Sequence, residues 1–332
     1  MHALNVGVIG LGVMGSSHAR VYDKIPFVNL KSVCDANIEK LNQLATEFNT
    51  RGFTDYLAML DDPDLDAVSI CLPDNMHVEA IKAAISKKKH ILVEKPLANT
   101  VEDAIKIYDA LKDYDRVFTV GYNLRFDPRY SLTKQNISEG KMGDIISVYC
   151  RRNSPITGPL RFVGFTDLRQ HVMVHDINVV NWFMPSKPVK VFAKSRSVLL
   201  KQYDMTDTIF AIVTYEDGSL ACFEACWVLN KISPSVVDDK LEVIGTKGTI
   251  YTDSCDCGFR IISDEGVKYP DSRYRPVING LYGGALYEEL TSFINCIIKN
   301  TSPVVSVEEC VLDLRVVEAI ERSIKEECEV LL

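Results

Sequence analysis

Three glycines at a fixed spacing carry the clearest chemical signal in the sequence. Gly10, Gly12 and Gly15 form a G-x-G-x-x-G pattern, with Val13 and Met14 between the last two. An apolar run precedes the pattern and a helical pattern follows it. In that context the first glycine permits a tight turn, the second lets the backbone approach a pyrophosphate, and the third lets the helix pack on the strand. The start of the helix then faces the phosphate charge. We expect these five residues to bind a dinucleotide.

An acidic residue after the second predicted strand indicates which dinucleotide this is. Asp35 lies 20 residues beyond Gly15, where a carboxylate accepts hydrogen bonds from the adenosine ribose. A carboxylate repels a 2′-phosphate, and the following Ala36 and Asn37 offer no arginine to bind one. The sequence therefore favours NAD over NADP as the cofactor. The alternative is a glycine-rich turn that binds nothing.

A loop after another predicted strand is the second candidate for cofactor contact. It runs from Leu72 and Pro73 through Asn75 to His77, where a helix is expected to begin. Ligands of open parallel sheets bind at the carboxyl ends of strands. We expect these four residues to contact the cofactor, with capping or packing as the alternative for His77. His18, in the helix after the glycines, is expected to be a surface or packing residue.

Two histidines and an aspartate in the second half of the chain are spaced by four residues. Asp167, His171 and His175 fall in a segment, 167–183, whose apolar spacing predicts a helix. Steps of four place side chains on one helix face, and a row of titratable groups suits proton transfer. The alternative is a pair of solvated or core histidines. Two histidines and one acid are too few ligands for zinc, so we expect no metal here.

The predicted elements indicate the scaffold that positions these residues. Short apolar runs alternate with helical patterns in the first third, which predicts βαβ units and a parallel sheet. Later strands are joined by hairpin turns, which predicts a mainly antiparallel sheet. Thr100 with Asp103, and Ser306 with Glu309, have the spacing of capping boxes. The predicted strands are 6–9, 30–34, 67–72, 91–93, 117–120, 144–152, 189–198, 209–215, 220–229, 241–244 and 249–252, and the predicted helices are 16–23, 38–48, 78–86, 100–112, 167–183, 285–298 and 306–325.

Composition and charge exclude some classes of function. The 332 residues carry a formal net charge of −8, whereas a nucleic-acid surface needs a basic excess. No apolar run reaches the roughly 20 residues that cross a bilayer, so no membrane partner is expected. The absence of a signal peptide and ten scattered cysteines favour a reducing cytoplasm. Cys255 and Cys257 form one close pair but lack two further zinc ligands, so no metal is expected there either.

A larger set of motifs resembles a known family of oxidoreductases. Glu94-Lys95-Pro96 follows a predicted strand, residues 121–128 read GYNLRFDP, His175 precedes Asp-Ile, and residues 245–248 read GTKG. With the glycine pattern and the loop 73–77, these motifs span nearly the whole chain. They resemble the glucose–fructose oxidoreductase, inositol dehydrogenase and rhizopine-catabolism family, called Gfo/Idh/MocA. The resemblance implies an α/β fold, with an N-terminal Rossmann domain on a doubly wound parallel sheet (1–121) and a C-terminal α+β domain on a mainly antiparallel open sheet (122–332).

The same resemblance implies roles for individual residues. Lys95 matches the family lysine that reaches both the nicotinamide ribose and the substrate hydroxyl, and Glu94 precedes it at the cofactor. His175 matches the family histidine that acts as base or acid. The alternative for Lys95 is a surface lysine that merely follows a strand.

Several polar residues resemble groups that line the substrate cleft of the family. Tyr122, Asn123 and Arg125 are the candidates, and a structural salt bridge is an equal alternative for Arg125. Further positive charge in the second half, together with Lys95 and Arg125, indicates an anionic substrate such as a nucleotide sugar. These additional residues are Arg151, Arg152 and Arg161.

One position departs from the family pattern. Inositol-dehydrogenase-like members have an aspartate four residues before the catalytic histidine, where this chain has His171. The Lys–Asp–His triad is therefore not intact. His171 is expected to bind a substrate hydroxyl or phosphate, or to orient His175.

These observations predict an NAD-dependent dehydrogenase. It would transfer hydride at a CH–OH group of a sugar, an inositol-like polyol or a nucleotide sugar, with Lys95, His175 and His171 as catalytic residues. A non-catalytic NAD-binding regulator and a glycosidase that uses NAD transiently are the competing hypotheses. The open sheet predicts a homodimer or homotetramer.

Overall fold

The computed structural model describes residues 3–255, 259–264 and 266–332. Backbone contacts divide the chain into two compact units. The first combines Met1–Asp127 with Ser272–Val311, and the second combines Pro128–Asp271 with Leu312–Leu332. This grouping differs from the expected division at Gly121, because the segment 272–311 packs with the N-terminal residues. No helix in the described part of the chain has the length and apolar character needed to cross a membrane.

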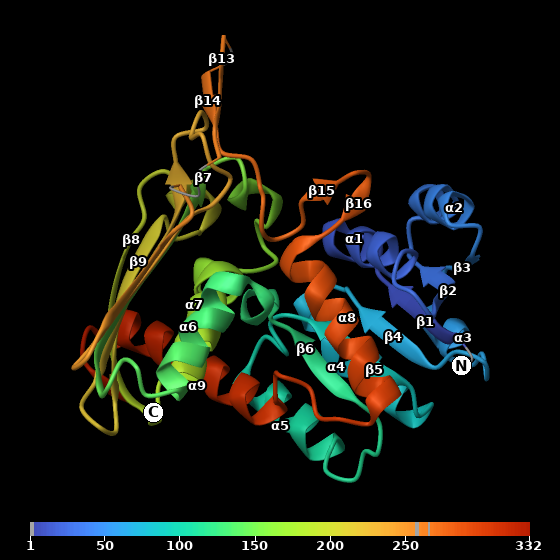
Figure 1. Ribbon diagram of the computed structural model, residues 1–332, viewed down its shortest axis with the longest axis horizontal. Coiled ribbons are helices and arrows are strands. Elements are labelled where there is room, and N and C mark those ends of the chain that lie inside the picture. Colours follow the sequence, from blue (N-terminus) through green and yellow to red (C-terminus); the bar gives the residue numbers. More distant parts are fainter. Residues whose placement is uncertain (1–2, 256–258, 265) are drawn as a thin grey trace. The chain divides into compact units, whose positions relative to one another are not determined.

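The first unit is built on a six-stranded parallel sheet (Figure 1). The strand order is β3-β2-β1-β4-β5-β6, so the order reverses between β1 and β4, the switch point at which doubly wound sheets bind ligands. The predicted parallel sheet is confirmed. Its strands are β1 (Leu4–Ile9), β2 (Val28–Cys34), β3 (Arg51–Phe53), β4 (Ala67–Ile70), β5 (His90–Glu94) and β6 (Phe118–Gly121), and its helices are α1 (Val13–Tyr22), α2 (Ile38–Glu47), α3 (Tyr56–Leu60), α4 (His77–Ser86), α5 (Val101–Ala110) and α8 (Gly284–Lys299).

Helix α8 belongs to this unit although it lies near the end of the chain. It contacts α1, and Figure 1 shows the two helices side by side. Leu286, Leu290 and Phe293 of α8 join the same buried cluster as Val8 and Tyr22. A short hairpin of β15 (Val277–Ile278) and β16 (Leu281–Tyr282) precedes α8. The C-terminal segment therefore completes the core around the first strands.

The turn between β1 and α1 requires glycine at two positions. Gly10 has a φ of +85°, and a β-carbon there would lie 2.6 Å from the carbonyl oxygen of Cys71. A β-carbon at Gly15 would lie 1.7 Å from the carbonyl oxygen of Gly10. At Gly12 a β-carbon would meet no atom within 4 Å. Gly10 therefore has the backbone conformation of a tight turn, Gly15 allows the close approach of α1 to the turn, and Gly12 borders open space.

The second unit is built on a seven-stranded sheet of order β12-β11-β7-β10-β9-β8-β17. Neighbouring strands are antiparallel except β7 and β10, which are parallel. The predicted mainly antiparallel sheet is confirmed. Its strands are β7 (Ile145–Pro155), β8 (Pro188–Arg196), β9 (Thr208–Tyr215), β10 (Leu220–Leu229), β11 (Asp238–Gly245), β12 (Thr249–Asp253) and β17 (Val330–Leu331), and its helices are α6 (Pro128–Ser138), α7 (Val174–Phe183) and all but the first turn of α9 (Val307–Glu326). A separate hairpin pairs β13 (Ile261–Ser263) with β14 (Gly266–Lys268).

The helix predicted over 167–183 is wrong in its first part. Arg169–Met173 forms a π-helix, and the α-helix α7 begins only at Val174. Hydrogen bonds in a π-helix run from i to i+5, so the turn that carries His171 is wider than an α-helical turn. Asp167 lies before the helix, where its carboxylate accepts hydrogen bonds from the backbone N–H groups of Arg169 (2.8 Å) and Gln170 (3.1 Å). Asp167, His171 and His175 therefore do not lie on one continuous α-helix.

The two predicted capping boxes are realised to different extents. At the start of α9, Ser306 Oγ accepts from the Glu309 N–H at 3.3 Å, and Glu309 Oε2 accepts from the Ser306 N–H at 3.1 Å. Before α5, Thr100 Oγ1 accepts from the Asp103 N–H at 3.1 Å, but the Asp103 carboxylate binds Lys106 instead. The first box is complete, and the second is a simple cap.

The glycine turn gives a paired prediction. Gly15→Ala should lower the free energy of unfolding by about 3 kcal/mol or more, because the new β-carbon collides with backbone that cannot move aside cheaply. Gly12→Ala should leave stability within about 0.5 kcal/mol, as expected where the added group meets open space. Chemical denaturation of both variants measures the difference. Equal stability of the two variants would contradict the packing argument.

Candidate active site

The glycine turn and the start of α1 form an exposed cradle. Gly12 is the N-cap of α1 and has no side-chain cap, and both Gly12 and Val13 are exposed. The first N–H groups of a helix have no partner within the helix, and they lie at the positive end of its dipole. Open space at Gly12 lets an anion reach them. The cradle therefore fits a dinucleotide pyrophosphate.

Asp35 lies directly beside this cradle. Its Oδ2 accepts a hydrogen bond from the Leu11 N–H at 2.7 Å, and its Oδ1 accepts from the Asn37 N–H at 2.8 Å. The first bond ties the end of β2 to the glycine turn. A carboxylate has about four acceptor positions, so a side chain held in this way still suits the hydroxyl groups of a ribose.

The loops after β4 and β5 border the same edge of the sheet. Ile70 pairs with Val93 in the parallel register, so these two loops leave the sheet as neighbours. Pro73 and Asn75 are exposed, and Lys95 is partly exposed. This edge therefore brings together the cradle, the candidate loop and the candidate lysine.

His77 holds these two loops together. Its side chain is fully buried, Nδ1 lies 3.0 Å from the carbonyl oxygen of Pro96, and Nε2 lies 3.0 Å from that of Leu72. These contacts favour the packing alternative for His77 over direct contact with a cofactor.

Glu94 and His18 form a buried pair inside the first unit. Glu94 Oε1 lies 3.0 Å from His18 Nε2, and His18 Nδ1 lies 3.0 Å from Ser69 Oγ. His18 is fully buried and Glu94 is 7% exposed. The carboxylate of Glu94 thus faces the protein interior, whereas the next residue, Lys95, is partly exposed.

The residues expected to line a substrate cleft differ in exposure. Tyr122 and Arg125 are buried, and Asn123 is partly exposed. Arg125 Nη1 donates to the carbonyl oxygen of Val304 at 3.0 Å and to Glu309 Oε2 at 2.9 Å. These contacts lie within the first unit and favour the structural alternative for Arg125.

In the second unit, His171 lies among aromatic rings. Its ring centroid is 4.1 Å from that of Phe162 and 6.5 Å from that of Trp227. The π-helix places it there, and its side chain is partly buried. This setting combines a titratable ring with an apolar wall.

His175 lies in the first turn of α7 and is partly exposed. The adjacent Asp176 is buried, with Oδ2 3.0 Å from Arg152 Nε and Oδ1 2.9 Å from Arg152 Nη2. Arg151 Nη2 lies 2.6 Å from Asp238 Oδ1. Two of the arginines that indicated an anionic substrate thus hold internal ion pairs, and that argument loses most of its support.

One residue near the cradle gives no signal in the local sequence. Arg275 Nη1 lies 3.3 Å from Ser17 Oγ and 3.8 Å from Met14 Sδ, both on α1. The segment that carries it is tied to α8, because the Ala285 N–H donates to the carbonyl oxygen of Arg273 at 2.7 Å. Ser17 and Arg275 are 258 residues apart, so only the fold brings this positive charge to α1.

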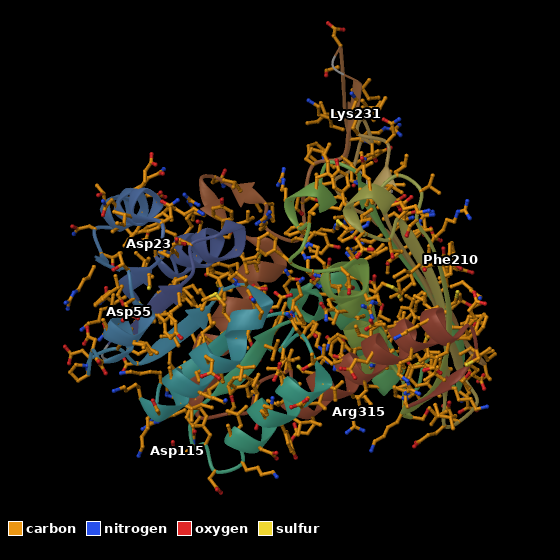
Figure 2. The ribbon with its side chains drawn as sticks, turned by 180° about the vertical axis from the view of Figure 1, so that it is seen from behind. Asp23, Asp55, Asp115, Phe210, Lys231 and Arg315 are labelled. Carbon is orange, nitrogen blue, oxygen red and sulfur yellow. The ribbon has the colours of Figure 1, made fainter. Side chains whose placement is uncertain are left out.

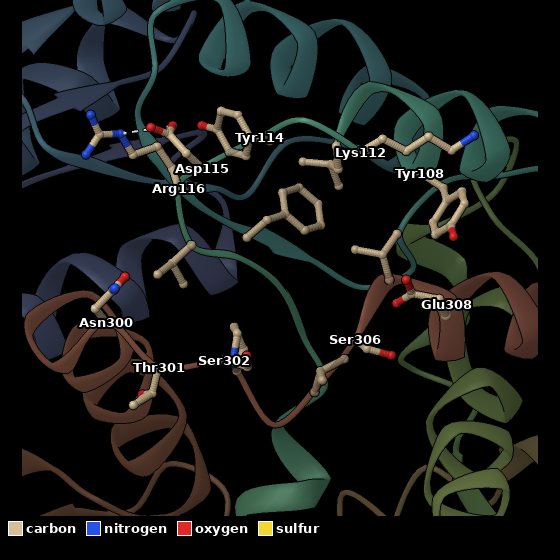
Figure 3. A pocket seen from close by; sticks show the side chains of 16 residues that line it. Tyr108, Lys112, Tyr114, Asp115, Arg116, Asn300, Thr301, Ser302, Ser306 and Glu308 are labelled. Atoms are coloured by element: carbon tan, nitrogen blue, oxygen red, sulfur yellow. Dashed lines mark ion pairs between the residues drawn. The ribbon is translucent and has the colours of Figure 1, made fainter.

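A cavity of about 620 Å³ lies elsewhere in the first unit (Figure 3). Its lining residues fall between 108 and 118 and between 300 and 308. Phe118, at the amino end of β6, is among them. The glycine turn leaves the carboxyl end of β1, so this cavity borders the opposite edge of the sheet and is not the candidate site.

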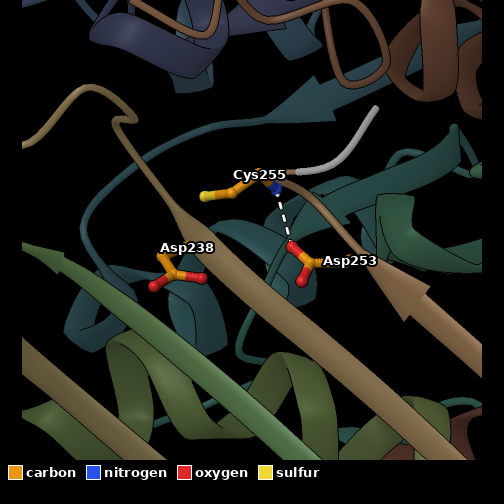
Figure 4. A group of neighbouring side chains, drawn as sticks. All are labelled: Asp238, Asp253 and Cys255. Atoms are coloured by element: carbon orange, nitrogen blue, oxygen red, sulfur yellow. Dashed lines mark hydrogen bonds between the residues drawn. The ribbon is translucent and has the colours of Figure 1, made fainter. Parts of the chain in front are cut away.

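A cluster of possible metal ligands lies in the second unit (Figure 4). It comprises Asp238, Asp253 and Cys255. Arg151 pairs with Asp238 at 2.6 Å and Lys240 pairs with Asp253 at 2.7 Å, so both carboxylates already face cations. Burial raises the pKa of the Cys255 thiol, which opposes metal binding. Cys257, the other member of the close cysteine pair, lies outside the described residues.

Comparisons with known proteins agree with this geometry. Residues 4–122 match the family model for the oxidoreductase family with an NAD-binding Rossmann fold, and residues 130–251 match the GFO/IDH/MocA C-terminal domain. Over 330 residues, covering 97% of each chain, the protein is 26% identical to myo-inositol 2-dehydrogenase of Thermotoga maritima. It is 30% identical to inositol 2-dehydrogenase 2 of Saccharopolyspora erythraea over 67% of this chain and 66% of that one.

Solved structures show the same fold. Scyllo-inositol dehydrogenase of Lactobacillus casei, solved with NAD(H) and scyllo-inositol, superposes with a TM-score of 0.86 at 24% identity and covers 99% of both chains. The family models together cover most of the chain in the order that the fold requires. The chain is therefore a member of the Gfo/Idh/MocA family and an NAD-dependent oxidoreductase.

Proposed function

We propose that the protein oxidises a secondary hydroxyl of an inositol-like polyol or a related sugar and passes the hydride to NAD. The observation that carries the proposal is the cofactor edge of the first unit, where Gly12, Asp35 and Lys95 lie around one cradle. Inositol dehydrogenases among the full-length relatives support a polyol substrate. The internal pairing of Arg151 and Arg152 favours a neutral polyol over a nucleotide sugar.

The proposed reaction gives each candidate residue one task. NAD supplies the hydride acceptor. In the first unit, Lys95 positions and polarises the substrate hydroxyl from the end of β5. In the second unit, His175 accepts the hydroxyl proton, a task for which an imidazole is suited. His171, against Phe162, binds a substrate hydroxyl beside an apolar wall that suits the C–H face of a ring.

We further propose that two copies of the chain associate through the outer face of the second unit's sheet. Phe192 of β8 and Ile212 of β9 are paired across the two strands and are 40% and 46% exposed. Phe210, labelled in Figure 2, is 50% exposed on the same face. The alternate residues of β9 are buried. A row of large apolar side chains on a broad face suits a second copy of the same face in a two-fold dimer.

Replacing Lys95 tests the proposed reaction. Lys95→Met should lower kcat at least about a hundredfold, since it removes a proton-handling group. The NAD dissociation constant should stay within about twofold of the wild-type value, because the glycine cradle and Asp35 are unchanged. NADH formation is followed by absorbance with myo-inositol, scyllo-inositol, free sugars and UDP-sugars, and NAD binding by fluorescence titration. Lys87→Met, an exposed lysine paired with Asp61, is the matched control.

The same panel separates the competing functions. Wild-type activity in Lys95→Met would reject the role of Lys95. Tight NAD binding with no turnover on any compound would instead identify a regulator, and product release without NADH would identify a glycosidase.

Arg275 is predicted to strengthen cofactor binding. Its charge lies against α1, close to the cradle for the pyrophosphate, so Arg275→Met should weaken NAD binding about tenfold or more, the range of a charged hydrogen bond. Arg322→Met, on the exposed part of α9, should bind NAD like wild type. Calorimetric titration of the three proteins checks this, and an unchanged dissociation constant for Arg275→Met would contradict it.

The sheet face gives a prediction for assembly. Ile212→Glu places a charge in the proposed contact, so the molar mass from light scattering should fall to that of one chain at concentrations where wild type is dimeric or larger. Leu57→Glu on α3, 50% exposed in the other unit, should not change the mass. A monomeric wild type, or an unaffected Ile212→Glu variant, would exclude this interface.

A further inference from the structure

We propose that His18 and Glu94 are positioning residues for Lys95, and that their buried pair holds the carboxyl end of β5. The inference rests on the proposed role of Lys95. It assigns a function to His18, which the sequence presented as a surface or packing residue.

The pair is the end of a continuous hydrogen-bonded chain. The Tyr22 hydroxyl lies 3.0 Å from Ser69 Oγ, Ser69 Oγ lies 3.0 Å from His18 Nδ1, and His18 Nε2 lies 3.0 Å from Glu94 Oε1. If Tyr22 donates to Ser69 and Ser69 donates to Nδ1, a neutral imidazole donates its Nε2–H to Glu94. Every proton in the chain then has an acceptor, and the imidazole is fixed in one tautomer.

Glu94 connects this chain to Lys95. Its Oε2 accepts the backbone N–H of Lys95 at 3.2 Å. The carboxylate also lies against β6, since a β-carbon at Gly121 would come within 3.3 Å of Oε1. The group therefore links α1, β5 and β6 at the peptide from which the Lys95 side chain departs. Rotation of Glu94 would release that peptide.

The charges around Glu94 agree with this role. An ionised carboxylate is stable in a buried place only when it is paired. Burial alone would raise the pKa of Glu94, but the hydrogen bond from His18 and the charge of Lys95 hold that pKa below its ordinary value. Burial is the main influence on the other acidic groups nearby, and it raises their pKa values. These groups are Tyr22 on α1, Cys71 after β4, Asp74 in the following loop and Glu289 on α8.

Simple core packing makes a different prediction from positioning. A histidine that only fills space can be replaced by leucine with a loss of stability and no effect on chemistry. A positioning histidine loses function when its donor is removed and recovers it when a donor is restored. Glutamine can place an amide nitrogen near the position of His18 Nε2, whereas leucine cannot.

The test compares His18→Leu, His18→Gln and Glu94→Gln with a matched control. His90 lies at the amino end of β5, and its Nδ1 accepts the Val117 N–H at 2.9 Å, so His90→Leu removes a histidine from the same strand far from Lys95. We expect His18→Leu and Glu94→Gln to lower kcat about tenfold or more, the usual cost of losing a group that orients a reactive residue. KM and NAD affinity should change by less than about twofold. His18→Gln should recover most of kcat, and His90→Leu should change only thermal stability.

A second readout uses the protein without cofactor. Reductive methylation with ¹³C-formaldehyde labels the lysines, and loss of one resonance in Lys95→Met identifies Lys95. Removing the negative charge of Glu94 should lower the pKa of Lys95 in Glu94→Gln, and His90→Leu should leave it unchanged. This titration does not depend on knowing the substrate.

Two results would overturn the inference. One is wild-type kcat together with an unshifted Lys95 titration in Glu94→Gln. The other is a loss of kcat in His90→Leu as large as in His18→Leu. Failure of the proposed function has a separate signature, because Lys95→Met itself would then retain activity.

Discussion

The close approach of α1 to β1 is the constraint on which the first unit depends. No side chain fits between the carbonyl oxygen of Gly10 and residue 15, where a β-carbon would stand 1.7 Å away. The helix can therefore begin directly above the strand end, with its first N–H groups at the edge of the sheet. The same placement puts His18, on the second turn of α1, within reach of Ser69 on β4 and Glu94 on β5. The contact that allows an anion to bind thus also sets the buried pair behind Lys95.

Buried charge is used in both units to fix backbone rather than to create open binding sites. Arg125 bridges Val304 and Glu309, and Glu309 simultaneously caps α9. Asp176, the residue that follows His175, binds Arg152. Such pairs add little net stability compared with apolar groups of the same shape, but losing one partner is costly. They therefore specify where the neighbouring residues stand, which is what reactive side chains require.

The sequence predicted what depends on local pattern. The parallel sheet, the glycine turn, Asp35 beside it and the hairpins of the second unit all follow from periodicity and turn residues, and the structure has them. Helix α6 was not predicted from the sequence. Its buried residues are Tyr130 and Thr133, so it has no apolar stripe to detect. The strand β3 has three residues, too few for a period of two to be recognised. The π-helix at 169–173 keeps the composition of an α-helix, so spacing alone predicted one continuous α-helix over 167–183.

Pairing between residues far apart in the chain explains the remaining differences between the predicted and the observed structure. Whether an arginine binds substrate or completes an ion pair depends on partners far along the chain, as for Arg151 with Asp238, and no local pattern encodes that choice. The packing of residues 272–311 with the first unit is likewise not encoded by any local pattern. It carries Arg275 to α1 and Glu289 to the neighbourhood of Glu94, so charged residues from the end of the chain lie beside elements formed by its beginning. In this fold the glycine motif can be recognised from a local pattern, whereas the charged groups that lie near α1 and Glu94 arrive through tertiary contacts.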